Sequence, residues 1–170
     1  MHAVTARAHH RHPDADTDIV ADAVLGASRA LVAVAARSLA TVADDVTLAQ
    51  YRVLIELAAR GPQRLADLAD ALTVDRSTAT RMCDRLARKR LIGRRRSSDD
   101  RRVVRVSLTD SGADLVAEVS RSRHAEIRRI VRRMPASSRP LVVDALQAFA
   151  KAAGEVPEQD WSLGWGIQHD

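Results

Sequence analysis

The sequence predicts a mainly α-helical fold with one small β-hairpin, on the strength of three observations. Apolar residues recur at three-to-four-residue spacing, typical of amphipathic helices, through most of the 170 residues. Only 2% of the residues are aromatic although 46% are hydrophobic, so the core must consist of Ala, Val and Leu, which favours close-packed helices. The stretch from Arg102 to Leu108 instead alternates residues between two faces, which predicts a β-strand.

The first long apolar segment predicts a helix from Asp18 to about Val42, preceded by a flexible arm over residues 1–17. Its apolar residues do not keep to one stripe, since Ile19 and Leu25 lie away from the main face. A helix that is apolar on several faces is buried on several sides. In a chain of this length a second copy is a natural source of the extra surface, so we assign residues 18–45 to dimerisation.

Several classes of site and location are disfavoured by the composition. His9, His10 and His12 could bind a metal, but no Cys or carboxylate cluster completes a site near them, so we expect a solvated arm with no metal or cofactor. A single cysteine, Cys83, excludes an intrachain disulfide. No apolar run approaches the ~20 residues of a membrane span, and the start lacks the apolar core of a signal peptide. We therefore expect a cytoplasmic protein without a membrane partner.

Catalysis is not expected either. The chain offers no Ser-His-Asp, Cys-His, metal-binding or phosphate-loop constellation, and an enzyme site needs convergent groups of that kind.

Three short helices are predicted in the middle of the chain. Thr47 can cap the first, and Gly61-Pro62 ends it. The second covers about Arg64 to Leu72. Asp75 caps the third, after a turn of only three residues. Two short amphipathic helices that share so tight a turn are typical of a helix-turn-helix.

The helix that begins after Asp75 has an apolar face and a basic face. Ala79, Met82, Cys83 and Leu86 recur at i, i+3, i+4 and i+7, so this side faces the core. Short hydroxyls and arginines lie on the remaining surface: Arg76, Ser77, Thr80, Arg81 and Arg85. Hydroxyls let a helix approach phosphates and base edges, and arginine can bind guanine O6 and N7 together. Taken alone, the helix could equally present an ordinary solvated face.

A basic hairpin follows and favours DNA binding. Leu91-Ile92 begins its first strand and Arg94, Arg95 and Arg96 continue it. Arg101 and Arg102 lie where the chain returns. From Arg76 to Arg105, twelve Arg or Lys residues oppose three Asp, a net +9 in a chain whose total is +5. Such a basic block indicates a polyanionic partner, and a basic hairpin beside a recognition helix can reach the adjacent minor groove.

The hairpin turn also contains two carboxylates, Asp99 and Asp100. We expect one or both to pair with an arginine and fix its direction, because a free carboxylate would repel phosphate. Residues 46–109 are therefore predicted to form a winged helix-turn-helix that binds double-stranded DNA.

Two more helices are predicted after the hairpin. Thr109 can cap a long one that Pro135 ends, and a shorter one covers about residues 137–153. We assign residues 110–154 to dimerisation, together with the first helix. Residues 155–170 form a short tail whose tryptophans, Trp161 and Trp165, can pack on the body or on a partner.

The order of these elements resembles the MarR family of transcriptional regulators. The resemblance covers residues 47–112 by motif and 19–153 by helix order. Its motifs are Leu65-Ala-Asp-Leu-Ala69, Val74-Asp-Arg-Ser-Thr-Ala-Thr-Arg81, Asp84-Arg85-Leu86, Leu91-Ile92, Asp100-Arg101-Arg102 and Val106-Ser-Leu-Thr109-Asp-Ser-Gly112. The Asp-x-Arg wing that closes into Leu-Thr-x-x-Gly is the specific part.

The resemblance implies a homodimer that places one recognition helix in a major groove and one wing in a minor groove per subunit. It implies that Arg102 lies at the wing tip and that Asp100 orients either this arginine or one on the recognition helix. The residues that it puts at the major groove are Arg76, Ser77, Thr80 and Arg81. The other basic residues, assigned to phosphate, are Arg85, Arg94, Arg95, Arg96 and Arg101.

The resemblance further implies a ligand-responsive repressor on a palindromic operator. A small aromatic or phenolic effector would bind among the helices that begin near Asp18, Thr47 and Thr109. The alternative is a sequence-independent, nucleoid-type DNA-binding protein.

Two residues differ from what the family often has. Thr73 and Arg90 stand where many members have Gly, which blurs where those helices end. Some members sense oxidants through a cysteine near the start of the first helix, and this chain has none there. We interpret Cys83 as a small core residue. A redox role is the alternative, because oxidation of this inward position would disturb DNA binding.

Overall fold

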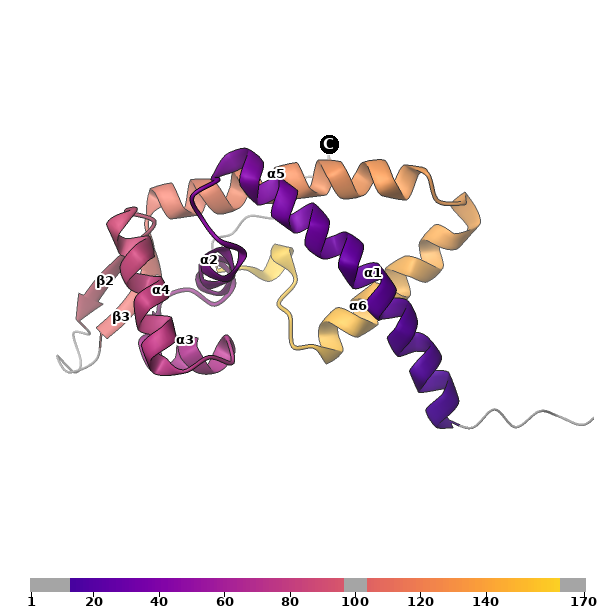
Figure 1. Ribbon diagram of the computed structural model, residues 1–170, viewed down its shortest axis with the longest axis horizontal. Coiled ribbons are helices and arrows are strands. Elements are labelled where there is room, and N and C mark those ends of the chain that lie inside the picture. Colours follow the sequence, from indigo (N-terminus) through magenta and orange to yellow (C-terminus); the bar gives the residue numbers. More distant parts are fainter. Residues whose placement is uncertain (1–12, 97–103, 163–170) are drawn as a thin grey trace, which may run out of the picture.

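The computed structural model describes residues 13–96 and 104–162, and it confirms a mainly α-helical fold with a small antiparallel sheet (Figure 1). The helices are α1 (Pro13–Val42), α2 (Leu48–Arg60), α3 (Leu65–Ala71), α4 (Arg76–Arg88), α5 (Asp110–Arg132) and α6 (Arg139–Ala152), with short 3-10 turns η1 (Ala136–Ser138) and η2 (Glu158–Asp160). The strands are β1 (Gln63–Arg64), β2 (Ile92–Arg96) and β3 (Val104–Leu108).

Some of the residues singled out in the sequence lie outside the described ranges. They are the arm histidines His9, His10 and His12, the hairpin residues Asp99, Asp100, Arg101 and Arg102, and Trp165.

The elements form two lobes that α5 connects (Figure 1). The winged-helix lobe consists of α2, α3, α4 and the sheet, together with the first turns of α5. The helical lobe consists of α1, the C-terminal part of α5, and α6. Helix α1 packs along α5, where Arg37 pairs with Glu126 through an Nε–Oε1 hydrogen bond of 2.9 Å.

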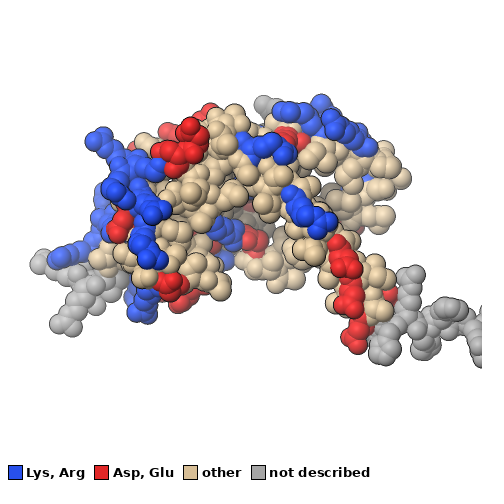
Figure 2. All heavy atoms as spheres, in the orientation of Figure 1, with Lys and Arg blue, Asp and Glu red and all other residues tan. Residues whose placement is uncertain are grey.

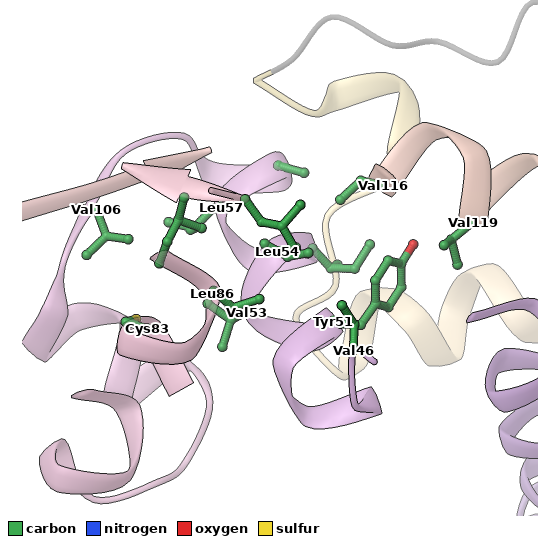
Figure 3. Close-up of a cluster of buried hydrophobic side chains, with 14 of the residues drawn as sticks. Val46, Tyr51, Val53, Leu54, Leu57, Cys83, Leu86, Val106, Val116 and Val119 are labelled. Carbon is green, nitrogen blue, oxygen red and sulfur yellow. The ribbon is translucent and has the colours of Figure 1, made fainter. Parts of the chain in front are cut away.

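One core fixes the recognition helix within the winged-helix lobe (Figure 3). Leu54 and Leu57 of α2, Leu86 of α4, Val106 of β3 and Val116 of α5 are all fully buried in it. These side chains are aliphatic, as the shortage of aromatic residues requires. Because α4 shares this core with α2, the position of the recognition helix depends on that of α2.

The sheet has three strands where the sequence indicated two. Strand β3 lies in the middle, antiparallel to both neighbours, with Gln63 opposite Val106 on one side and Ile92 opposite Leu108 on the other. The added strand, β1, is only two residues long. A pair of residues after Gly61-Pro62 is too short to carry a period-two pattern, so only its pairing partner reveals it.

The first helix begins at Pro13, five residues before the expected start at Asp18. The expected flexible arm was therefore wrong for Pro13–Thr17. Proline fits the first turn of a helix because its missing N–H has no partner there and its φ angle is already helical. Asp14 and Asp16 in the same turn favour a helix N-terminus.

By length and composition, the stretch Asp14–Val42 is also apolar enough to cross a membrane. We expected no apolar stretch of that size, and this expectation was wrong. Ala-rich sequence around isolated charges nevertheless satisfies the criterion, and packed helices of soluble proteins satisfy it as well. Helix α1 thus has apolar surface that is unfavourable in water unless another protein surface packs against it.

Two residues outside the regular helices adopt positive φ angles without being glycine: Thr73 (φ 54°) after α3, and Arg90 (φ 60°) after α4. These are the two positions where the MarR family often has Gly. The left-handed conformation costs an ordinary L-residue about 1–2 kcal/mol, and a β-branched residue such as Thr adopts it least readily. The tight turn before α4 is therefore strained.

Replacing Thr73 by Gly is expected to stabilise the chain. Relief of the strain exceeds the extra chain entropy of Gly, so the gain should be about 1 kcal/mol, which raises Tm by about 2–4 °C. Thermal unfolding checks this, with Thr73→Ala as the matched control because it keeps a Cβ at the same φ. Equal melting temperatures for the Gly and Ala variants would contradict the explanation.

Candidate DNA-binding surface

The recognition helix α4 begins on a tightly bonded cap. Asp75 Oδ1 accepts hydrogen bonds from the Thr78 backbone N (2.8 Å) and from Ser77 Oγ (2.5 Å), and Oδ2 accepts one from Thr78 Oγ1 (2.7 Å). The Ser77 and Thr78 hydroxyls and the Thr78 N–H together hold the pKa of Asp75 well below its ordinary value. The cap is therefore ionised at neutral pH and weakens only when the pH falls below the usual titration range of an aspartate.

The outer face of α4 combines hydroxyls that are already engaged with arginines that are exposed. Ser77 donates to Asp75, and the half-buried Thr80 donates its hydroxyl to the carbonyl oxygen of Arg76 at 2.7 Å. Arg76, Arg81 and Arg85 are exposed. The two hydroxyls are thus committed to bonds within the first turns of α4, whereas the exposed arginines keep donors for a partner.

Thr78 aims one of these arginines and was missed by the sequence analysis. Its Oγ1 accepts a hydrogen bond from Arg81 Nη2 at 2.9 Å while donating to Asp75. A chain of polar contacts therefore runs from the cap through Thr78 to Arg81. The Asp-x-x-Thr spacing of a capped helix start was the available signal.

Replacing Thr78 by Val should weaken the binding of cognate DNA. The substitution keeps the shape of the side chain but removes the acceptor that orients Arg81, so we expect a loss of about 1 kcal/mol, or roughly fivefold in Kd. Fluorescence anisotropy with labelled duplex measures it. Thr41→Val is the matched control, because the Thr41 hydroxyl makes a local bond to the Arg37 carbonyl oxygen on α1, away from α4. Equal losses in both variants would rule out the orienting role.

The wing is tied to the recognition helix by an ion pair. Arg94 Nη2 lies 2.7 Å from Asp84 Oδ1, and the Arg94 side chain is 35% exposed. Arg94 shares its face of the sheet with Val106, so it extends toward α4. This pairing gives Arg94, which the sequence assigned to phosphate, a second role in holding the wing against α4.

Cys83 lies in the interior, on the side of α4 that faces the core (Figure 3). Burial raises the pKa of its thiol, and the nearby Arg94 offsets only part of that rise. A neutral, enclosed thiol is a weak nucleophile. This environment fits the interpretation of Cys83 as a packing residue.

The strand register brings three arginines into one row across the sheet. Arg105 of β3 lies opposite Arg95 of β2 on one side and opposite Arg64 of β1 on the other, and all three are exposed. Like charges directly opposite each other destabilise a sheet. A bound polyanion removes that penalty. Arg64 and Arg105 were missed because only the register shows that they join Arg95.

Basic side chains gather over the winged-helix lobe. Figure 2 shows Lys and Arg side chains over much of this lobe and a smaller group over the C-terminal end of α5, whereas the start of α1 is acidic. A concentrated positive field on one face attracts a polyanion and speeds its association. The geometry of the winged-helix lobe therefore suits a nucleic acid.

Known proteins share this architecture. The model of the MarR family matches residues 46–104. The HTH-type transcriptional repressor MdtR of Bacillus subtilis is 33% identical over 123 residues, which are 72% of this chain and 79% of that protein.

The chain belongs to the MarR family.

Solved structures agree with this assignment. RV1404 from Mycobacterium tuberculosis matches with a TM-score of 0.78 and 42% identity, covering 83% of this chain and 96% of that one. The apo form of MarR from E. coli matches with a TM-score of 0.62 and 25% identity, covering 78% and 94% respectively. This MarR-family protein is a DNA-binding transcriptional regulator with a winged-helix fold.

Proposed function

We propose that this MarR-family protein is a cytoplasmic, ligand-responsive repressor that binds a palindromic operator as a homodimer. The observation that supports the homodimer is the apolar surface of the helical lobe. Its exposed large side chains are Ile19, Val20, Leu25, Leu31 and Val32 of α1, and Leu141, Val143, Leu146 and Phe149 of α6. A monomeric soluble protein rarely leaves so many large apolar side chains of two helices exposed. A second copy would cover it, and the relative MdtR is named a repressor.

Within this proposal, α4 enters the major groove and the wing enters the adjacent minor groove. Its major-groove residues are Arg76, Ser77, Thr80 and Arg81, and its wing-tip residues are Asp100 and Arg102. The phosphate contacts comprise Arg85, Arg94, Arg95, Arg96 and Arg101, to which the sheet adds Arg64 and Arg105. Support comes from the exposure of the described arginines and from the bond that aims Arg81.

We place the effector, a small aromatic or phenolic molecule, among α1, α2 and α5. Arg123 of α5 lies over the ring of the buried Tyr51 of α2, with its Cζ 5.5 Å from the ring centroid. Ser38 of α1 is 1% exposed, and its hydroxyl has no hydrogen-bond partner within the described ranges. A cation beside an aromatic ring favours an anionic aromatic ligand, and a buried hydroxyl without a partner favours a polar one.

DNase footprinting upstream of the protein's own gene tests the regulator. We expect one protected site with two inverted half-sites about 10 bp apart, because a two-fold dimer presents its recognition helices one helical turn apart. Analytical ultracentrifugation should give the mass of a dimer. Equal affinity for all sequences at physiological salt would instead support the nucleoid-type alternative, for which affinity depends on salt rather than sequence.

A further inference from the structure

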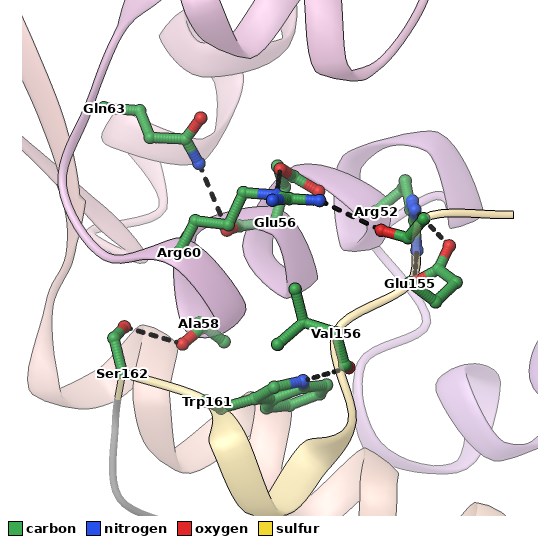
Figure 4. A network of polar contacts seen from close by, with 10 residues as sticks. Arg52, Glu56, Ala58, Arg60, Gln63, Glu155, Val156, Trp161 and Ser162 are labelled. Atoms are coloured by element: carbon green, nitrogen blue, oxygen red, sulfur yellow. Dashed lines mark hydrogen bonds and ion pairs between the residues drawn. The ribbon is translucent and has the colours of Figure 1, made fainter. Parts of the chain in front are cut away.

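The chain after α6 returns to the winged-helix lobe as a strap, residues 154–162 (Figure 4). Trp161 is 9% exposed and belongs to the same core as Leu54 and Leu57 of α2. Its indole Nε1 donates to the Val156 carbonyl oxygen at 2.9 Å, so the strap is folded on itself around the ring. A buried Trp with a satisfied N–H is a strong anchor.

Polar contacts attach the strap to the last turns of α2. Ser162 donates from its N to the carbonyl oxygen of Ala59 (3.2 Å) and from its Oγ to that of Ala58 (2.9 Å). Carbonyls in the final turn of a helix have no partner within the helix, so Ser162 satisfies two of them. The guanidinium of Arg52 donates hydrogen bonds to both carboxylate oxygens of Glu155, at 3.2 and 2.5 Å. The strap therefore follows α2 closely.

These contacts give the two lobes a further connection. Helix α5 has its N-terminal turns in the winged-helix lobe, and its C-terminal part reaches the helical lobe (Figure 1). The segment between α1 and α2 also joins the lobes, with Leu39 and Val46 in the core of the winged-helix lobe. The strap joins the end of α6 to α2 at a different place, and this additional connection restricts how far one lobe can twist against the other. Since α2 and α4 share a core, the strap also restricts α4.

We propose that Trp161 is a positioning residue, which holds each recognition helix at the separation that both half-sites of an operator require. This inference rests on the proposed homodimer. When one half-site is bound, the second binds at an effective concentration that depends on how well the other recognition helix is already placed. A rigid strap raises that concentration by removing orientations that cannot reach the DNA. Within the described ranges, the hydrogen bonds and ion pairs of the strap involve none of the residues assigned to DNA.

The test lengthens the strap without removing its anchor. Four residues, Gly-Ser-Gly-Ser, are inserted between Ala153 and Gly154, where no atom lies within 4 Å of the position that a Gly154 Cβ would take. Trp161, Ser162 and Glu155 can then keep their contacts with α2, whereas Trp161→Ala would remove part of the core and could prevent folding. The matched control carries the same four residues after Asp170, which leaves the strap unchanged.

Binding is measured on two duplexes, the site selected from a random library by the unmodified protein and a version in which one half-site is scrambled. We expect the insertion to weaken binding to the full site about tenfold and to leave binding to the half-site unchanged. Sedimentation and thermal unfolding of the variant should match the control, since lengthening a loop by a few residues costs little.

The outcomes separate this inference from the proposed function. If the unmodified protein binds full and half sites equally, the proposed homodimer on a palindrome is wrong. If it prefers the full site and the insertion variant prefers it just as strongly, the positioning role of Trp161 is wrong. Equal weakening on both duplexes, or tighter binding to the full site, would also overturn it.

Discussion

Replacing Gly112 by Ala is expected to lower the free energy of unfolding by about 3 kcal/mol or more, because the site is already filled by backbone. A Cβ at this position would lie 2.0 Å from the Leu91 carbonyl oxygen and 3.0 Å from its carbon. Contacts that short require one of the two backbone segments to move. Gly112 is the final residue of the Leu-Thr-x-x-Gly motif, and this close approach explains why Gly is needed there.

The neighbouring hydrogen bonds leave Leu91 little freedom to move. Its carbonyl oxygen accepts from the Thr109 backbone N at 3.2 Å, and Thr109 Oγ1 donates to the Arg90 carbonyl oxygen at 2.6 Å. The same Oγ1 accepts from Gly112 N at 3.1 Å, which caps α5. One threonine thus joins the end of α4, the end of the wing and the start of α5. Displacing Leu91 would disturb all three elements.

Thermal unfolding checks the Gly112 prediction, with an expected fall in Tm of about 6–12 °C for a loss of about 3 kcal/mol in a chain of this size. Gly93→Ala is the matched control, since the nearest atom to its added Cβ would be Ser107 Oγ at 3.8 Å, an ordinary contact. We expect that variant to melt within about 2 °C of the unmodified protein. A Gly112→Ala variant that melts as the control does would mean that the first turn of α5 can shift freely.

Local signals in the sequence predicted the recognition helix well. The cap at Asp75 set its first residue, and the spacing of Ala79, Cys83 and Leu86 set its inward face, as the structure confirms. Thr73 and Arg90 stood out as departures from the family, and both have positive φ angles. Each of these features depends on residues that lie a few positions apart in the chain. The geometry of the helix or turn alone fixes how such residues are placed.

Features that depend on pairing across long distances could not be predicted in the same way. The row of Arg64, Arg95 and Arg105 exists only because three strands align in one register. The tail carrying Trp161 was expected to pack somewhere, but the sequence did not indicate α2 as its partner. The direction of Arg94 likewise depends on Asp84 of another element. Such contacts follow from the fold and leave no periodic signal in the residues themselves.

Replacing Arg81 by Ala should cost about 1–3 kcal/mol of discrimination between cognate and random DNA, roughly 5- to 150-fold in the ratio of affinities. Arg81 lies in the second turn of α4, exposed, with its guanidinium aimed by Thr78. Residues near the start of a recognition helix contact base edges, and an arginine there can bind O6 and N7 of one guanine together. Its loss therefore affects the cognate site far more than random sequence.

The control for Arg81 is Arg88→Ala, which removes the same charge two turns further along the same face of α4, where the side chain is also exposed. If Arg88 contacts only phosphate, its loss should weaken cognate and random DNA alike and reduce the slope of log K against log salt by about 1. Arg102→Ala at the wing should resemble Arg88→Ala unless the operator has a narrow minor groove, where arginine also reads shape. Equal losses on cognate and random DNA for Arg81→Ala would show that it, too, contacts only the backbone. Base recognition would then have to come from Arg76, the exposed arginine in the first turn of α4.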